Sequence, residues 1–410
     1  MGTAEVMEAN TTMRVLHVIP AVAPRYGGPS RAIVQMCGAL QEQGSELLIA
    51  TTDADGPGRL QIELDRRILF NGVPTIFFSR QWSEALKYSY PLARWLDSNV
   101  KKFDLVHIHA VFSHACLAAA RSCRRNRVPY IVRPLGTLDP WSLQQKRFRK
   151  RLFWQLAAKR MLGEAAAIHY TADAERRLAE HALDLKRGVV IGLGVDSALL
   201  RNESGAGLFR QSQPSLGSHP FVLVMSRIHP KKGLELLLRS FMEVIAEKRF
   251  QHWRLVIAGD GDPAYIQSLK QLVRENRVEP HILFPGWLEG AEKVSALRSA
   301  DLLALASHQE NFGLCVVESL ACGVPVLVST EVNLCREIEA ARAGWVTRLN
   351  PKDLKEALQG ALQDKEERQQ RGLAGRELAR RRFSWPAIAR ELIDLYQRIG
   401  NAGLDQKHCA

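Results

Sequence analysis

"ESGAGLFRQSQPSLGSHPFVLVMSRI", residues 203–228, contains the change of composition that decides the fold of this chain. Its first part, residues 203–220, is rich in Gly, Ser and Pro, which is typical of an interdomain linker. Its second part, residues 221–228, is an apolar run of the kind that forms a buried strand. Because similar runs lie both before and after this point, the stretch predicts two α/β halves joined by a linker.

Short apolar runs alternate with helical patterns in both halves, and one such helix is expected over residues 30–43. Nearly continuous apolar strands alternating with helices are typical of a parallel sheet covered on both faces. We therefore expect two Rossmann-like, doubly wound parallel-sheet domains that face a cleft. The expected strands occupy residues 14–20, 46–52, 73–78, 104–110, 128–134 and 166–172 in the first half, and 221–228, 253–261, 281–287, 300–307 and 324–330 in the second.

Chain length also favours two domains, because 410 residues exceed what a single hydrophobic core usually supports. The expected boundaries are an N-terminal domain over residues 1–200, the linker over 201–220, a C-terminal domain over 221–382 and a final helical segment over 383–410. That last segment places Ile388, Leu392, Leu395 and Tyr396 at helical spacing. It therefore predicts an amphipathic helix packed on a domain, and it can return to the N-terminal one.

Composition excludes several classes of protein and leaves others open. No apolar run reaches the roughly 18 to 20 residues of a membrane helix, and the first residues lack the pattern of a signal peptide, so we expect a cytoplasmic protein. The seven cysteines include no CxxC pair and are expected to be reduced thiols. The net charge is +13, of which residues 1–200 contribute +9. A basic surface of this kind suits nucleic acid, an anionic membrane or phosphorylated small molecules.

Ligands of doubly wound domains bind at the carboxyl ends of the strands, so the loops that follow the strands are the first places to look for a site. After the first strand, "PAVAPRYGGPSR" replaces the GxGxxG of a dinucleotide enzyme, which argues against a dehydrogenase. Gly27 and Gly28 still permit close backbone approach, and Ser30 is placed to cap a helix that Arg31 continues. This is either an anion site at a helix N-terminus or a plain glycine turn.

Two cations follow the first strand of the second half, where "SRIHPKKGLELLL" contains Arg227 and Lys232. Projecting from a strand end, they suit a diphosphate, although a solvated basic turn is equally compatible with the sequence. Two D-x-D sequences, Asp53 with Asp55 and Asp260 with Asp262, could hold a divalent metal. Aspartate beside glycine at a strand end is more often a turn former.

His107 and His109 lie on one face of an expected strand, since side chains alternate with a period of two. His109 is at the carboxyl end, where it could reach the cleft as a hydrogen-bond donor or base, or be a satisfied core residue. The basic stretch over residues 144–162 has the pattern of an amphipathic helix, which suits either a membrane surface or ordinary half-burial.

The stretch "ASHQENFGLCVVESLACGVPVLVS", residues 306–329, holds Glu310 and, within an apolar run, Glu318. A buried carboxylate needs a salt-bridge partner or a ligand. Together with "YGGPSRAI", "DLVHIHA", "SRIHPKKGLELLL", "VIAGDGD", "FPGW" and "FSWPAIA", this pair of glutamates resembles the GT-B fold retaining glycosyltransferases of family 4, also called group 1. The resemblance runs from about Arg14 to the last helix.

The resemblance implies roles for particular residues. Glu318 would bind the ribose of a nucleotide sugar, Glu310 the transferred sugar, and Arg227 with Lys232 the diphosphate, while His109 would lie beside the anomeric carbon. Eight helical rises between the glutamates would span about 12 Å, the reach of such a donor. The implied catalytic residues are His109, Glu310, Arg227 and Lys232, and the implied donor-binding residues are Gly27, Gly28, Arg227, Lys232, Gly259, Asn311, Phe312, Gly313, Leu314 and Glu318.

The resemblance thus implies a metal-independent hexosyltransferase that needs no cofactor, with an acceptor that is a sugar, glycolipid or polysaccharide. An anionic membrane surface is a further expected partner, on the inner face of the membrane, and nucleic acid is not expected. One alternative is a nucleotide-sugar epimerase of the same fold, which would release free sugar. The other is a basic nucleic-acid-binding protein, for which only residues 144–162 interleave aromatic and basic side chains.

Overall fold

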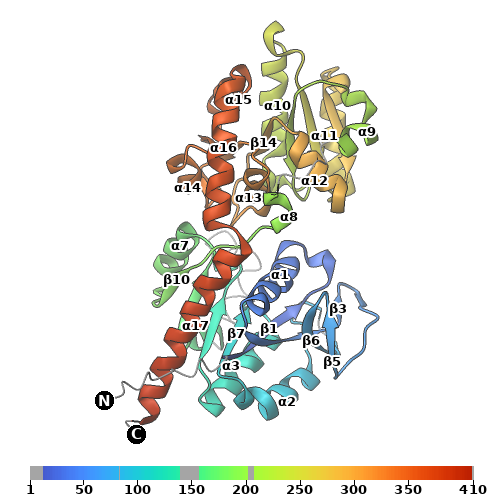
Figure 1. Ribbon diagram of the computed structural model, residues 1–410. Helices are drawn as coiled ribbons and strands as arrows, with labels where there is room; N and C mark the ends of the chain where they lie inside the picture. Colours follow the sequence, from blue (N-terminus) through green and yellow to red (C-terminus); the bar gives the residue numbers. More distant parts are fainter. Residues whose placement is uncertain (1–12, 83, 139–156, 202–206, 409–410) are drawn as a thin grey trace, which may run out of the picture. The chain divides into compact units, whose positions relative to one another are not determined.

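The computed structural model describes residues 13–82, 84–138, 157–201 and 207–408 (Figure 1). The chain forms two compact units. Unit 1 comprises residues 1–171, 176–191 and 388–410, and unit 2 comprises residues 172–175 and 192–387. Both units are built on a predominantly parallel sheet, as the strand and helix alternation predicts.

The sheet of unit 1 has eight strands, and all neighbours are parallel except the edge strand β5, which runs antiparallel to β6. Apolar side chains fill these strands, so both faces of the sheet need covering. The order across the sheet is β10 (Gly188–Val190), β9 (Ala167–Tyr170), β8 (Tyr130–Arg133), β7 (Leu105–His109), β1 (Arg14–Ala21), β2 (Glu46–Thr52), β6 (Val73–Phe78) and β5 (Arg67–Phe70).

The two faces of this sheet carry different side chains because strand residues alternate. On one face, Val106 and Ile108 of β7 join an apolar cluster with α2 (Tyr90–Asn99) and α3 (His114–Asn126). On the opposite face, His107 and His109 are fully buried, and the side chain of His107 contacts α17 (Trp385–His408).

The helix α17 supplies part of the core of unit 1 from the far end of the chain (Figure 1). The four residues that its sequence places at helical spacing, Ile388, Leu392, Leu395 and Tyr396, are all buried. Unit 1 also contains α1 (Gly28–Glu42), close to the expected residues 30–43, and the short α6 (Lys159–Gly163). Most of the basic stretch over 144–162 lies outside the described residues.

The sheet of unit 2 has six parallel strands. Its order is β13 (Ile282–Gly286), β12 (Arg254–Ala258), β11 (Phe221–Met225), β14 (Leu302–Leu305), β15 (Val326–Ser329) and β16 (Gly344–Thr347). Both faces are helix-covered: α10 (Leu234–Ile245) and α15 (Pro351–Gln363) pack against one apolar cluster, while α13 (Leu314–Ala321) contacts β14, β15 and α16 (Lys365–Arg382). The remaining helices used below are α11 (Pro263–Glu275) and α12 (Gly290–Ser299).

The linker expected over residues 201–220 differs from the structure. Residues 207–212 form the helix α9, which packs on α12, and Pro214–Leu216 form a 3-10 turn. Both belong to unit 2, whose long segment begins at Gly192 rather than near residue 221. The segment joins the unit because Phe209 and Leu216 are buried, and a composition of Gly, Ser and Pro does not reveal two anchoring apolar side chains.

Among the described helices, none combines the length and the apolar character needed to cross a membrane.

Candidate functional site

The carboxyl end of β14 leads into a loop, residues 306–313, that ends at the N-terminus of α13. Gly313 is the residue before the helix and has a φ of 73°, a left-handed conformation that favours glycine. The first amides of a helix have no acceptor within it, and the helix dipole makes this end positive. The apolar run 314–321 folds as a helix because Val316, Val317 and Leu320 are buried against the sheet.

Two lysine–glutamate pairs lie around this helix end. Lys232 binds the carboxylate of Glu310, and Lys293 Nζ lies 2.6 Å from Glu318 Oε1. All four side chains are mostly shielded from solvent. The charges of both pairs act on the thiol of Cys315, whose pKa is raised to about 12, chiefly by burial. One ion pair thus involves the loop before α13 and the other a residue of α13, and both act on Cys315 in the first turn of the helix.

The sequence-based estimate of about 12 Å between Glu310 and Glu318 assumes that one helix contains both residues. This assumption is wrong, because Glu310 is not helical. Glu310 belongs to the loop, where it bridges to Val332 and donates its N–H to the carbonyl of Glu331 at 3.0 Å. Only Glu318 lies on α13. The eight-residue spacing is thus made of a loop and one helical turn, and a helical rise cannot measure it.

The loop after β11 lies against this site. Ser307 Oγ and the N–H of His308 both donate to the carbonyl of Lys231, at 3.1 and 2.8 Å. Lys232 is thereby held beside Glu310, whereas Arg227 is exposed and has no ion-pair partner among the described residues. The structure brings Lys232, Glu310 and Glu318 together around one helix end.

Gly259 holds a second loop close to the one that carries Arg227. It has a φ of 151°, and a Cβ at this position would lie 1.8 Å from the carbonyl oxygen of Ser226. The next turn continues the contact, because the N–H of Ile228 donates to the carbonyl of Asp260 at 2.8 Å. Gly259 therefore acts by allowing the two strand-end loops to approach, and its contact with a donor stays a prediction.

Asn311, Phe312 and Leu314 complete the loop and the first helical turn. Phe312 is buried and meets the ring of Phe383 edge to face at 5.7 Å between centroids. The side chain of Asn311 is 3.5 Å from that of Asn333. These contacts fix the loop, while backbone binding of a sugar by these residues stays a prediction.

The two D-x-D sequences differ: the aspartates of the second make the local turn and cap bonds that their glycine neighbours favour, whereas those of the first contact distant residues. Asp260 Oδ1 accepts from the N–H of Gly261 at 2.8 Å, and Asp262 caps α11 through the N–H of Tyr265 at 2.9 Å. In unit 1, Asp53 accepts from the N–H of Arg80 at 2.6 Å, and Asp55 forms an ion pair with Arg25.

The glycine turn of unit 1 corrects one sequence expectation. Ser30 is not the cap of α1, because the helix begins at Gly28 and its cap is Gly27, which has a φ of 76°. The buried Ser30 hydroxyl instead lies 3.5 Å from the carbonyl of Ala21. A Cβ on Gly27 would meet nothing within 4 Å, so its conformation rather than crowding requires glycine. Donor binding by Gly27 and Gly28 stays a prediction.

His109 belongs to a buried histidine network in unit 1. His17 Nδ1 lies 3.1 Å from His109 Nε2, and His169 Nδ1 lies 3.2 Å from His107 Nε2. Burial, and then the nearby Arg133 guanidinium, lowers the pKa of His17 to about 3. Burial also holds the pKa of His109 well below its usual range. These imidazoles are therefore neutral near pH 7.

The hydrogen-bond partners fix the tautomers in half of this network. The carbonyl of Ile191 can only accept, so His169 Nε2 carries a hydrogen and His169 Nδ1 accepts from His107 Nε2. His107 Nδ1 then accepts from the Tyr396 hydroxyl at 2.8 Å. Three ring nitrogens of His17, His107 and His109 lie near enough to share a metal ion. A metal there would have to replace a bond of His107 beside a guanidinium, so the geometry favours the hydrogen-bonded network.

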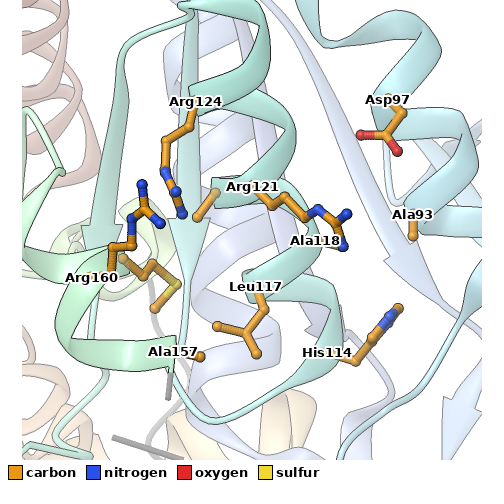
Figure 2. A pocket seen from close by; sticks show the side chains of 11 residues that line it. Ala93, Asp97, His114, Leu117, Ala118, Arg121, Arg124, Ala157 and Arg160 are labelled. Atoms are coloured by element: carbon orange, nitrogen blue, oxygen red, sulfur yellow. The ribbon is translucent and has the colours of Figure 1, made fainter. Parts of the chain in front are cut away.

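A pocket of about 530 Å³ opens on the helices of unit 1 (Figure 2). Its lining includes the apolar side chains of Leu117 and Met161 and arginines of α3 and α6. Two of them, Arg124 and Arg160, form ion pairs with Glu164. The single carboxylate of Glu164 therefore offsets only part of the positive charge that these two arginines bring to the pocket.

Lys293 is the site residue that the sequence does not reveal. It lies in α12, 25 residues before its partner, in a stretch with no recognisable motif. In the protein without a ligand, the negative charge of the Glu318 carboxylate is therefore paired with the ammonium of Lys293.

The folds of the two units place this chain in the GT-B class. Anabaena HepE, solved with UDP and glucose, matches with a TM-score of 0.73 at 19% identity, covering 94% of this chain and 100% of HepE. Sucrose-phosphate synthase of Thermosynechococcus elongatus matches with a TM-score of 0.75 at 20% identity, covering 95% and 100%.

Two family models identify the family. The model for glycosyl transferases group 1 matches residues 208–378, and the model for a glycosyl transferase 4-like domain matches residues 27–194. The chain belongs to the group 1 family of glycosyl transferases, as the resemblance of its motifs predicts.

Curated relatives match over part of their length. A D-inositol 3-phosphate glycosyltransferase of Kineococcus radiotolerans is 28% identical over 59% of this chain and 60% of its own. A phosphatidyl-myo-inositol mannosyltransferase of Mycobacterium tuberculosis is 29% identical over 44% of this chain and 48% of its own. The matched region thus spans about half of each relative.

Proposed function

We propose that this protein is a retaining glycosyltransferase that moves a hexose from a nucleoside diphosphate sugar to a hydroxyl group of an acceptor. The observation that carries the proposal is that two ion pairs lie at α13: Lys232 pairs with Glu310 of the loop that leads into this helix, and Lys293 pairs with Glu318 of the helix itself. Alternating cations and carboxylates around a helix N-terminus suit a ligand that has an anionic diphosphate between two polyols.

The proposed assignment follows the chemistry of each group. Glu318 accepts hydrogen bonds from the ribose, the N-terminus of α13 and the cations Arg227 and Lys232 receive the diphosphate, and Glu310 binds the hexose. Binding of phosphate by Lys232 releases Glu310 from its ion pair, which leaves that carboxylate for the sugar hydroxyls. Cations and a helix dipole stabilise a leaving diphosphate, and for this reason we propose that no metal is required.

In the proposed mechanism the bond from the anomeric carbon to the diphosphate breaks while the acceptor oxygen attacks the same face. The leaving diphosphate oxygen takes the proton of the acceptor hydroxyl, so no nucleophile of the protein is needed. His109 is fully buried in unit 1 and its Nε2 faces His17, so the implied place of His109 beside the anomeric carbon is not part of this proposal. Its low pKa makes it a neutral hydrogen-bonding group rather than a cation.

The acceptor belongs to polysaccharide or glycolipid biosynthesis in this proposal. It is supported by the net charge of +9 in residues 1–200 and by the relatives whose names specify phosphorylated inositol or a phosphatidylinositol. The basic stretch 144–162 would then meet an anionic leaflet on the cytoplasmic side, where each cation contributes about 1 kcal/mol. Cosedimentation with vesicles of neutral and of anionic lipid tests this part, and equal binding to both would contradict it.

A thermal-shift screen of nucleoside diphosphates and their sugars tests the donor class. A ligand at 100 times its Kd should stabilise the unit that binds it by about 2.7 kcal/mol. The sugar nucleotide that binds is then incubated with candidate acceptors, and the anomeric configuration of the product is read by NMR. An inverted product would contradict retention, and free epimerised sugar without an acceptor would support the epimerase instead.

A further inference from the structure

Lys293 and Glu318 form an ion pair that connects two helices of unit 2. The ammonium of Lys293, on α12, is 2.6 Å from Oε1 of Glu318, on α13. The side chains are only 16% and 15% exposed. No other side-chain hydrogen bond to this carboxylate is made within the described part of unit 2, so Oε2 is left to accept from a ligand.

An ordinary structural ion pair is the simplest alternative explanation. Such pairs contribute little to stability when exposed, and partial burial adds a desolvation penalty that the attraction only partly offsets. The position of this pair is informative because Glu318 lies on α13, and the loop that leads into this helix carries Glu310 with its partner Lys232. Lys293 is therefore at the site itself and not on a remote surface.

A carboxylate that binds a vicinal diol must be ionised and correctly oriented before the ligand arrives. A glutamate has three rotatable side-chain bonds, and ordering it during binding weakens the affinity. An ammonium fixed on one oxygen restricts the rotation of the carboxylate and leaves the second oxygen directed elsewhere. Lys293 meets this requirement from a separate helix.

We propose that Lys293 is a positioning residue that orients Glu318 for the ribose hydroxyls and so sets the preference for a ribonucleotide donor. The inference rests on the proposed function, in which Glu318 binds the ribose. It goes beyond that function by assigning a residue that acts through Glu318 and not on the diphosphate. The effect of Lys293 should therefore disappear when the ligand lacks the hydroxyls that Glu318 binds.

The experiment compares a nucleoside diphosphate with its 2′,3′-dideoxy analogue by calorimetry, using the base preferred in the thermal-shift screen. The variants are Lys293→Met, which removes the charge, and Lys293→Arg, which keeps it. Lys352→Met is the matched control, because Lys352 is an exposed lysine of the same unit with no ion pair among the described residues. Melting curves without nucleotide verify that each variant is folded.

The expected result is that Lys293→Met weakens binding of the ribonucleotide about three- to tenfold, the loss associated with ordering one side chain. Binding of the dideoxy analogue should change less than twofold, and Lys293→Arg should restore most of the loss. In Glu318→Gln protein, the further change Lys293→Met should have little effect on either ligand. The control variant should match the unchanged protein with both.

Equal weakening of both nucleotides would overturn the inference, since Lys293 would then act on the phosphates, the base or the fold. Tighter ribonucleotide binding by Lys293→Met would also overturn it, because the lysine would then compete with the ribose. If the unchanged protein binds no nucleoside diphosphate, the proposed function fails and the inference with it. Nucleotide binding with the wrong dependence on Lys293 removes the inference alone.

Discussion

Tyr396 of α17 and His107 of β7 are joined by a buried hydrogen bond of 2.8 Å, although 289 residues separate them in the chain. The bond ends a chain of donors and acceptors that runs from the tyrosine hydroxyl through His107 and His169 to the carbonyl of Ile191. It links the last helix to the central strands of unit 1 through a polar contact with a defined direction.

Removing this hydroxyl should destabilise unit 1. Tyr396→Phe leaves His107 Nδ1 without its donor in a buried position, which costs about 1 to 3 kcal/mol. Calorimetry should show a lower melting temperature for unit 1, while unit 2, identified by its stabilisation with nucleotide, should melt as before. Tyr90→Phe is the control, because Tyr90 is 56% exposed. An unchanged unit 1 transition in Tyr396→Phe would show that the bond contributes nothing.

Acid should destabilise unit 1 before the carboxylates titrate. The pKa values of His17 and His169 are lowered to about 3, chiefly by burial, so the folded state stays neutral where the unfolded state, with pKa about 6.5, takes up protons. Stability contributed by this difference is complete above pH 6.5 and is lost as the pH falls toward 3. Each histidine adds a slope of up to about 1.4 kcal/mol per pH unit.

Urea unfolding of unit 1 between pH 7.5 and pH 5 measures this slope. The variant His17→Asn should reduce the pH dependence of the free energy of unfolding by the contribution of one histidine. This holds even if the substitution also changes the stability at pH 7.5. A slope unchanged by the substitution would mean that His17 takes up a proton in the folded protein.

The two glutamates should affect different steps. Glu318 is proposed to hold the ribose, which does not change during transfer, so Glu318→Gln should weaken binding of both the nucleoside diphosphate and the nucleotide sugar. Glu310 is proposed to hold the hexose, whose ring gains positive charge in the transition state. Glu310→Gln should therefore leave nucleoside diphosphate binding nearly intact and slow transfer about tenfold or more.

Calorimetry with the product nucleotide and single-turnover rates with the donor separate these effects. If Glu310→Gln abolishes nucleotide binding while Glu318→Gln does not, the donor lies in the reverse direction along the loop and α13.

Substitution of Lys232 should reduce turnover more than removal of divalent metal ions does. Lys232→Ala removes a cation from the proposed leaving group and should raise the barrier by about 3 to 4 kcal/mol, the usual effect of one such contact. Chelator should leave turnover largely intact. Loss of activity in chelator, restored by manganese, would instead assign Asp260 and Asp262 as ligands despite their turn and cap bonds.

The sequence predicts the strands of both sheets well because buried parallel strands are short apolar runs between helices. It misses three edge strands. Residues of β5 alternate between exposed and partly buried, and β10 and β16 are only three and four residues long, so the apolar signal of each is weak. Local motifs predict Glu310, Glu318 and Lys232 as site residues, and the structure shows that each of them belongs to an ion pair at α13 or at the loop before it. Their roles in catalysis stay predictions.

Contacts between distant segments are what the sequence cannot supply. Period-two alternation places His107 and His109 on one face of β7, but only the fold reveals that α17 covers that face. Likewise, nothing in the α12 stretch indicates that Lys293 meets Glu318, since helix packing determines which side chains of two helices touch. Such pairings depend on the three-dimensional neighbours of a residue, and no local pattern encodes them.

The division of the chain between the units has a consequence for biosynthesis. Nearly all of unit 2 is continuous in sequence, from Gly192 to Ala387, whereas unit 1 needs residues 388–410 in addition to its N-terminal part. On the ribosome, domains generally fold in the order in which they emerge. Here the N-terminal sheet lacks the helix that contacts His107 until α17 leaves the exit tunnel. The half that is translated first is therefore the half that finishes folding last.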